Sequence, residues 1–308
     1  MRFIFSKQGI IVILAAAVLG GGLLVLMGLR KPPEVPPVVE TKEVGPERKV
    51  IGRSVEGREI EAYAYGEGET HIRPGGLSTS SLDARSHLAF VGGIHGGYEW
   101  NSVLLAYTFL DYLDTHSGLI PENLKVTVIP SANPDAVFKV TGKEGRFTIS
   151  DVSTDAEILA SARFNAHKVD LNRNFDCKWK PESTWQSKKV SAGTVAFSEP
   201  EAAAIRDFVQ KEFPDAVVFW HSQANAVYAS ECEDGILPAT LDIMNAYSRA
   251  AGYKAVDSFD AYAITGDAEG WLASINIPAV TVELKTHESI DWEENLAGTL
   301  ALFELYRQ

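Results

Sequence analysis

The sequence alternates short apolar segments with longer segments of helical periodicity. The apolar runs HLAFV, LKVTVI, AVVFW and PAVTV have the length of buried strands. Between them lie segments such as NSVLLAYTFLDYLDTH and LPATLDIMNAYSRAAG, in which apolar residues recur at the spacing of a helix face. This alternation predicts an α/β fold with three α/β/α layers and a mixed, mostly parallel central sheet.

Helix starts and stops agree with this pattern. FSEPEAAAIRDFVQKEF opens with Ser198 and Glu201 three residues apart, which predicts a capping box at the start of a helix. The segment KVIGRSVEGREIEAYAYG predicts two strands around a turn at residues 55–58. No internal repeat is visible, and we expect one folded domain over residues 47–308.

The N-terminus has a different character. Residues 9–29 carry no charge, and at about 1.5 Å per residue they would extend roughly 30 Å, the thickness of a bilayer core. A cleaved signal peptide would have a shorter apolar region and a small-residue cleavage site, whereas this run ends in LRKPP. We therefore expect a short tip and one transmembrane anchor over residues 1–31, followed by a Pro-rich linker over residues 32–46.

The overall charge excludes one class of partner. The chain has 41 acidic and 28 basic residues, for a formal net charge of −13. A nucleic-acid-binding protein normally carries a cluster of Lys and Arg, and the sequence has none. We expect no nucleic acid as a partner.

Polar residues that can bind a metal or transfer a proton follow several predicted strands. His95, His221 and Glu283 stand at or beyond strand ends, where ligands bind in open α/β sheets. Catalytic zinc sites use three His or carboxylate ligands and leave a position for water. A single His at a strand end is more often a hydrogen-bonded structural residue, and we place five other histidines in that class: His71, His87, His116, His167 and His287.

Several short motifs occur in one order along the chain: GGIHGGYE, NPD, VDLNRNF, WHS and VEL. Together they resemble the carboxypeptidase A-like zinc metallopeptidase family, over essentially all of residues 47–308. The resemblance implies a zinc carboxypeptidase with one zinc ion per chain. It also implies a peptide substrate with a free C-terminus.

The resemblance makes His95, Glu99 and His221 the zinc ligands, with Asp170 orienting the first His. The family spacing is His-x-x-Glu, but here it is His-x-x-x-Glu, with Tyr98 at the usual ligand position. Positions three and four residues on lie near the same side of a helical turn. Because Tyr is a poor zinc ligand, Glu99 is the predicted third ligand.

Further roles follow from the same resemblance. Glu283 matches the general base, and Arg163 matches an Arg that stabilises the oxyanion. Asn172 and Arg173 match the pair that binds the terminal carboxylate of the substrate, for which the fork of Arg is suited. Tyr262 matches a mobile Tyr that closes over the substrate.

Acidic residues near these positions bear on the substrate. Glu269, with Asp267 close by, falls where the family has the floor of its side-chain pocket. Acidic groups there favour a basic side chain, or the amino group of a diamino acid in a cell-wall stem peptide. The competing interpretation is that both carboxylates are solvated and have no role. For Glu283, the competing interpretation is a structural ion pair with Lys285.

The two cysteines, Cys177 and Cys232, are either free thiols or one bridge. If the NRNF and WHS motifs line one metal site, the cysteines can approach within the ~4.4–6.8 Å Cα separation of a disulfide. A bridge would persist in an oxidising compartment. We therefore predict a disulfide, the N-terminus inside, and the catalytic domain on the outer face of a membrane.

Two other functions remain open. One is a zinc amidoacylase that acts on N-acyl amino acids with the same metal core. The other is an inactive, membrane-anchored binding module that retains the fold. A serine hydrolase is disfavoured, because the sequence has no G-x-S-x-G motif, and it also lacks the H-E-x-x-H zinc motif.

Overall fold

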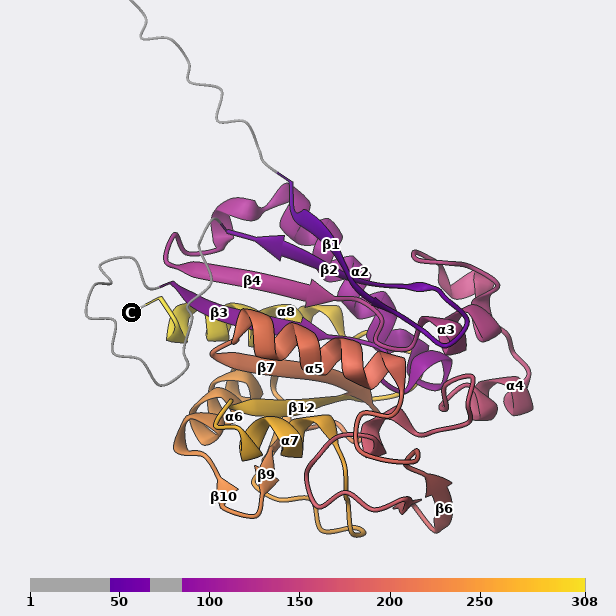
Figure 1. Ribbon diagram of the computed structural model, residues 1–308. Helices are drawn as coiled ribbons and strands as arrows, with labels where there is room; N and C mark the ends of the chain where they lie inside the picture. Colours follow the sequence, from indigo (N-terminus) through magenta and orange to yellow (C-terminus); the bar gives the residue numbers. More distant parts are fainter. Residues whose placement is uncertain (1–44, 67–84, 308) are drawn as a thin grey trace, which may run out of the picture. The chain divides into compact units, whose positions relative to one another are not determined.

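The computed structural model describes residues 45–66 and 85–307. It shows one eight-stranded sheet with helices against both of its faces (Figure 1), which confirms the predicted α/β fold. The predicted transmembrane anchor lies outside the described residues, as does nearly all of the predicted linker. Among the helices of the described ranges, none is long and apolar enough to cross a membrane.

The main sheet is mixed, with a parallel centre. Strands β4, β3, β7 and β12 run parallel to one another, while β2 joins β4 and β8 joins β12 in antiparallel pairs. At the two edges, β1 pairs antiparallel with β2 and β11 pairs parallel with β8. In spatial order the strands are β1 (Glu47–Arg53), β2 (Glu59–Tyr65), β4 (Leu124–Ile129), β3 (Ser86–Val91), β7 (Ala216–Ser222), β12 (Ala279–Leu284), β8 (Ala226–Ala229) and β11 (Lys254–Val256).

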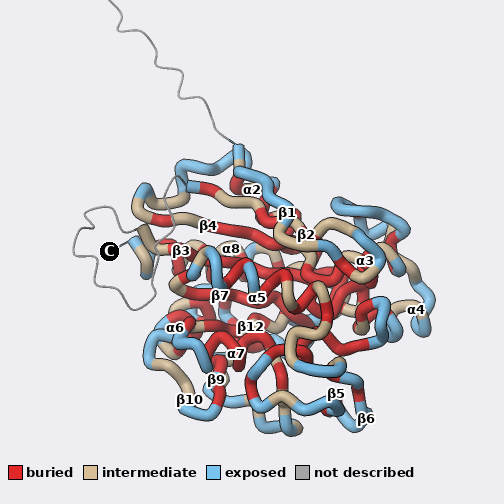
Figure 2. Tube along the Cα trace, viewed as in Figure 1, coloured by how far each residue is buried: buried red, intermediate tan, exposed pale blue. Residues whose placement is uncertain are grey.

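Each face of the sheet has its own apolar core, because successive side chains of a strand point to opposite faces. In β3, Leu88 and Phe90 join the core under one helix layer, and Ala89 and Val91 join the other. The buried residues follow the central strands and the helices packed on them (Figure 2). The first layer holds α2 (Trp100–Thr115), α6 (Pro238–Ala251) and α8 (Trp292–Leu305), and the second holds α5 (Pro200–Glu212) and α7 (Ala268–Ser274).

Shorter elements make up the rest of the secondary structure of the described residues. Two small hairpins pair β5 with β6 and β9 with β10. The short elements are η1 (Gly96–Glu99), η2 (Ser117–Leu119), α3 (Pro134–Thr141), η3 (Ile149–Asp151), α4 (Ala156–Ser161), η4 (Leu171–Arg173), β5 (Glu182–Trp185), β6 (Lys188–Ser191), β9 (Glu231–Cys232) and β10 (Gly235–Ile236).

The predicted capping box at the start of α5 is wrong. Glu199 occupies the N-cap, and no side chain of the described residues caps the helix there. Ser198 instead donates its hydroxyl proton to Glu199 Oε1 at 2.9 Å. The carboxylate of Glu201 accepts a hydrogen bond from the backbone N–H of Val55 at 3.0 Å. Ser198 and Glu201 therefore bind groups other than the first backbone N–H groups of α5, and the three-residue spacing between them cannot reveal this.

The predicted disulfide is present. Cys177 and Cys232 are joined with a Cα separation of 6.1 Å and an S–S distance of 2.09 Å. The bridge ties the loop that follows η4 to β9, across 55 residues of sequence. It lies beside the cavity described next, since Cys177 is one of the residues that line it. The alternative of two free thiols is therefore wrong.

Candidate metal centre and active site

Three neighbouring strands bring the polar residues together. His95 follows β3, His221 belongs to β7 and Glu283 belongs to β12. These strands are adjacent and parallel, so their carboxyl ends meet at the same edge of the sheet. His221 and Glu283 are direct register partners.

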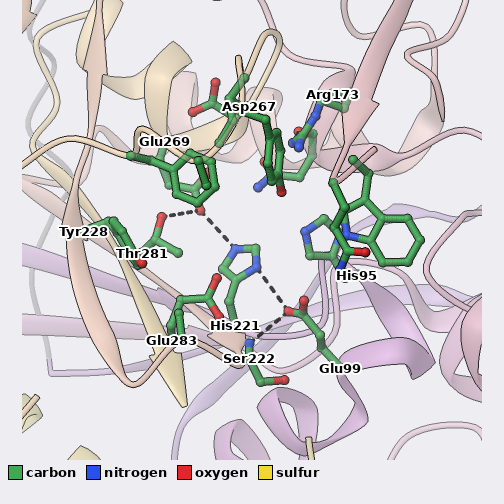
Figure 3. Close-up of a pocket in the computed structure, with 18 of the residues that line it drawn as sticks. His95, Glu99, Arg173, His221, Ser222, Tyr228, Asp267, Glu269, Thr281 and Glu283 are labelled. Carbon is green, nitrogen blue, oxygen red and sulfur yellow. Dashed lines mark hydrogen bonds and ion pairs between the residues drawn. The ribbon is translucent and has the colours of Figure 1, made fainter. Parts of the chain in front are cut away.

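The predicted zinc ligands converge. One ligand atom from each of His95, Glu99 and His221 lies within 4.8 Å of the others, and all three residues are buried. Glu99 Oε2 is 3.1 Å from His221 Nδ1 (Figure 3). Tyr98 points elsewhere, with its ring 5.2 Å from that of Trp185. Two imidazoles and one carboxylate form a donor set that zinc uses in catalytic sites.

Two glycines allow the chain to turn tightly between His95 and Glu99. Gly96 has φ +48°, and a Cβ there would lie 2.3 Å from the Cβ of Ala136 in α3. A Cβ at Gly97 would lie 2.5 Å from the carbonyl oxygen of Ala136. The short helix η1 can therefore press against α3 and place Glu99 beside His221. This local geometry explains how the longer His-x-x-x-Glu spacing still forms the site.

Asp170 links the first ligand to an arginine. Its Oδ1 is 3.5 Å from His95 Nδ1, and neither atom has a hydrogen-bond partner among the described residues. Its Oδ2 accepts a hydrogen bond from Arg163 Nε at 2.9 Å. The guanidinium of Arg163 also lies 4.5 Å over the ring of Trp185 and 3.9 Å from Glu99. Arg163 is thus held at the rim of the metal centre.

Glu269 makes the corresponding contact on the other ligand. Its Oε1 is 3.0 Å from His221 Nε2 and accepts a hydrogen bond from the Thr281 hydroxyl at 3.1 Å. The side chain is buried, so the alternative of a solvated carboxylate is wrong. Burial alone would raise the pKa of Glu269, but the hydrogen bond and charge of His221 lower it.

The centre is electrostatically suited to a cation. Burial and the charge of Arg163 lower the pKa of His95 well below its ordinary value. Burial would also lower the pKa of His221, but Glu99 and Glu269 raise it well above that value. The carboxylates therefore stabilise a positive charge between them, and a zinc ion bound by the triad supplies one.

Glu283 lines the same cavity as this centre. Its Oε2 is buried and has no hydrogen-bond partner within residues 45–66 and 85–307. Burial and the charge of Glu99 raise the pKa of Glu283 to about 8. The competing ion pair with Lys285 is wrong, because Lys285 pairs with Glu294 on the surface. An unpaired buried carboxyl oxygen needs a polar ligand such as water.

The centre opens into a cavity of about 590 Å³. Arg173 is buried in its wall and donates to the carbonyl oxygen of Thr184 through Nε and Nη2, both at 3.1 Å. The side-chain oxygen of Asn172 accepts from the backbone N–H of Ala268 at 2.8 Å, at the start of α7. Tyr262 also lines the cavity. The structure thus brings the predicted substrate residues together, while their roles remain predictions.

Asp267 lies at the same end of the cavity as Arg173 (Figure 3). Its Oδ2 accepts a hydrogen bond from the backbone N–H of Gly270 at 2.7 Å, which caps α7. Burial and the charge of Glu269 raise the pKa of Asp267 to about 6. This end of the cavity therefore combines one buried cation with two carboxyl groups.

The sequence interpretation missed a second set of cavity residues. The cavity is also lined by Thr281, Ser222 and His287. The sequence alone places His287 among the structural histidines. Thr281 could have been found, because it stands two residues before Glu283 and so faces the same side of β12. The other described histidines make structural contacts: His87 with Thr127, His116 with Tyr112 and His167 with Glu199, while His71 lies outside the described residues.

Comparison with known proteins points to one family. Residues 46–289 match the zinc carboxypeptidase family. The chain is 25% identical over 206 residues to gamma-D-glutamyl-L-diamino acid endopeptidase 1 of Lysinibacillus sphaericus, covering 60% of this chain and 51% of that protein. It is 29% identical over 233 residues to carboxypeptidase B of Helicoverpa zea, covering 68% of this chain and 53% of that protein. The chain thus spans about half the length of these two relatives.

A solved structure shares the fold. Murein-tripeptide amidase from Escherichia coli O157 superposes with a TM-score of 0.56 at 21% sequence identity. The match covers 86% of this chain and 94% of that one. At this level of identity the likeness concerns the fold alone.

Proposed function

Because this chain belongs to the zinc carboxypeptidase family, we propose that it releases a C-terminal amino acid from peptides. One observation carries this proposal: the buried Arg173 and Asn172 line the same cavity as the ligand triad. A fixed guanidinium in a cavity wall is suited to a carboxylate, which it can bind through two hydrogen bonds. The peptide terminus would occupy that end, with the scissile bond beside the triad.

The residues around the triad have distinct roles in the proposed reaction. Zinc, when bound, activates a water molecule and polarises the scissile carbonyl. Glu283 Oε2, which has no partner of its own, accepts the proton of the attacking water and passes it to the leaving amine. Arg163, fixed by Asp170, donates to the carbonyl oxygen as negative charge develops there.

Two carboxylates beside the ligand imidazoles hold the geometry of the site. Asp170 lies 3.5 Å from one ring nitrogen of His95, and Glu269 lies 3.0 Å from Nε2 of His221. Such carboxylates fix the tautomer and orientation of the ring. Asn172, through its bond to Ala268, also fixes the start of α7, which carries Glu269.

We propose that the terminal residue of the substrate carries an amino group on its side chain, as lysine and the diamino acids of cell-wall stem peptides do. Asp267 and Glu269 provide negative charge at the end of the cavity where that residue would lie. The names of the Lysinibacillus relative and of the Escherichia structure refer to a diamino acid and to murein. These names describe similar proteins, and the diamino acid in the name of the Lysinibacillus relative supports the proposed substrate class.

The amidoacylase remains the second candidate, since it would use the same triad and base. The terminus-binding Arg173 and Asn172 favour the carboxypeptidase. An inactive binding module is disfavoured, because it would have no need of the unpaired Glu283 beside an intact triad.

The proposal is tested by amino-acid release from the purified, zinc-loaded protein. Three matched substrates are compared: a peptide ending in lysine, its C-terminal amide and N-acetyl-lysine. We expect release from the free peptide and at least about tenfold less from the amide, since one lost charge-assisted pairing costs roughly 1.5–3 kcal/mol. Arg173→Ala should remove most of that difference. Preferential hydrolysis of N-acetyl-lysine would instead establish the amidoacylase.

A further inference from the structure

A hydrogen-bonded chain behind the metal centre starts at a buried asparagine. Both N–H groups of Asn101 are used, one by the carbonyl oxygen of Thr286 at 2.7 Å and one by that of Ser289 at 2.8 Å. This fixes the orientation of the amide, because a flipped amide would set its oxygen against two carbonyl oxygens. Asn101 Oδ1 is therefore an acceptor, and it takes the hydroxyl proton of Ser222 at 3.0 Å.

The direction of this bond determines the proton position on His287. Ser222 has one hydroxyl proton, and Asn101 accepts it. The contact of 2.7 Å between Ser222 Oγ and His287 Nδ1 must then be donated by the imidazole. His287 carries its proton on Nδ1, and Nε2 keeps a free lone pair. Burial also lowers the pKa of His287, which favours the neutral ring at pH 7.

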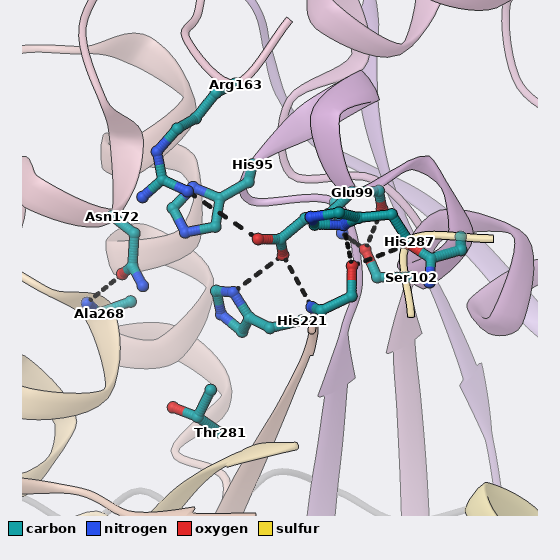
Figure 4. A network of polar contacts seen from close by, with 12 residues as sticks. His95, Glu99, Ser102, Arg163, Asn172, His221, Ala268, Thr281 and His287 are labelled. Atoms are coloured by element: carbon teal, nitrogen blue, oxygen red, sulfur yellow. Dashed lines mark hydrogen bonds and ion pairs between the residues drawn. The ribbon is translucent and has the colours of Figure 1, made fainter. Parts of the chain in front are cut away.

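His287 lines the same cavity as the metal triad, with its ring 4.7 Å from that of Tyr98. Figure 4 shows His287 beside Glu99, with Asn172 and Ala268 on the opposite side of the two ligand histidines. Ser222 connects the Asn101–Ser222–His287 chain to the metal centre, because its backbone N–H donates to Glu99 Oε2 at 3.2 Å. A peptide with its terminus near Asn172 would therefore place its acyl part at the His287 end.

We propose that His287 Nε2 accepts a hydrogen bond from the N–H of the residue on the acyl side of the scissile bond. This inference rests on the proposed carboxypeptidase function, which sets the direction of the substrate. Arg163, which lines the same cavity, offers a donor for a carbonyl group, while both donors of Ser222 are already used. A peptide N–H needs an acceptor, and Nε2 of His287 supplies it. His287 is thus a substrate-binding residue that selects peptides over simple acyl groups.

The test uses two substrates that differ in one group. Benzoylglycyl-lysine has the N–H, and benzoylglycolyl-lysine replaces it with an ester oxygen. For the zinc-loaded wild-type protein we expect kcat/KM for lysine release to be about tenfold higher for benzoylglycyl-lysine than for benzoylglycolyl-lysine. This is the effect of one hydrogen bond in a cavity. Equal rates for the two substrates would overturn the inference and leave the proposed function intact. No release from either would overturn both.

Two variants assign the effect to His287. His287→Ala removes the ring, while His287→Asn keeps an N–H for Ser222 in place of Nδ1 and removes the Nε2 acceptor. Both should lose the preference for the amide while binding zinc as the wild type does. His116→Ala, at the exposed end of α2, is the matched control and should keep the preference. A His287→Asn protein with the wild-type preference would overturn the assignment.

Discussion

Glu283 and His221 are direct register partners on the adjacent parallel strands β12 and β7. His221 belongs to the ligand triad, and Glu283 has a carboxyl oxygen that lacks a hydrogen-bond partner in the described part of the chain. Neighbouring strands thus hold a metal ligand and the proposed base at one level of the sheet. Each can be tested separately from the other.

Removal of a ligand imidazole should abolish tight zinc binding. We expect His95→Ala and His221→Ala to retain little zinc after dialysis, because two ligands rarely hold zinc in proteins. Glu99→Gln should weaken binding, since a neutral amide is a poorer ligand than a carboxylate. Metal analysis of the purified proteins measures this, with His116→Ala as the control. Full zinc occupancy in either His variant would contradict the ligand assignment.

Glu283→Gln should keep zinc and lose activity. The substitution removes the proton acceptor and leaves the ligand triad intact, so we expect kcat to fall by about 10²–10⁴-fold. The control is Glu294→Gln, which removes a surface carboxylate paired with Lys285. Near-wild-type turnover in Glu283→Gln would return this residue to a structural role.

The roles of Glu269 and Asp267 can be distinguished, because substitution of Glu269 should change zinc affinity and substitution of Asp267 should change substrate preference. Glu269→Gln should weaken zinc binding by about 10–100-fold, because it replaces the carboxylate on His221 Nε2. Asp267→Asn should leave zinc affinity unchanged and reduce the preference for terminal lysine over alanine. Competition with a chelator gives the first quantity and rates of amino-acid release give the second. Unchanged zinc affinity in Glu269→Gln would assign that residue to substrate selection alone.

Protonation of His87 should make the fold less stable in acid. Burial and the nearby charge of Lys125 lower the pKa of His87 to about 4, from an ordinary value of 6.5. Between these values the unfolded chain binds the proton and the folded chain does not, so the free energy of unfolding falls as the pH falls from 6.5 to 4. The expected loss is about 3 kcal/mol.

Urea unfolding at several pH values measures this loss. His87→Gln should show a smaller decrease between pH 6.5 and 4, because the titrating ring is gone. His116→Gln, whose ring is exposed, should retain the wild-type decrease. Parallel curves for His87→Gln and the wild type would show that His87 does not contribute.

The disulfide bears on the predicted location. We expect the Cys177–Cys232 bridge to form outside the cytoplasm, with residues 9–29 as the anchor and the N-terminus inside. Thiol labelling of intact cells should detect cysteines of this protein only after reductant. Protease added to intact cells should reach the catalytic domain. Protection of that domain until lysis would contradict the topology.

Much of the fold and of the metal site could be predicted from the sequence, for physical reasons. Strands such as β7 and helices such as α6 leave a clear apolar period. The ligands lie in motifs that were recognisable, and the flexible glycines at 96 and 97 permitted the unusual spacing. The Asn101–Ser222–His287 chain was missed, since its members come from three separate segments. The capping box failed because Glu201 binds a distant backbone N–H instead of its own helix start.

Strand β12 has a consequence for how the active site tolerates change. Val280, Val282 and Leu284 are buried in the core beneath α6 and α8, while Thr281 and Glu283 point to the opposite side of the strand. Inserting or deleting one residue would exchange these two sets, because side chains alternate along a strand. It would bury Glu283 among apolar side chains and turn a valine toward the metal. The apolar packing under α6 and α8 therefore determines which side of β12 carries the proposed base, and a change of one residue in the length of a regular β12 would disrupt both the core and the site.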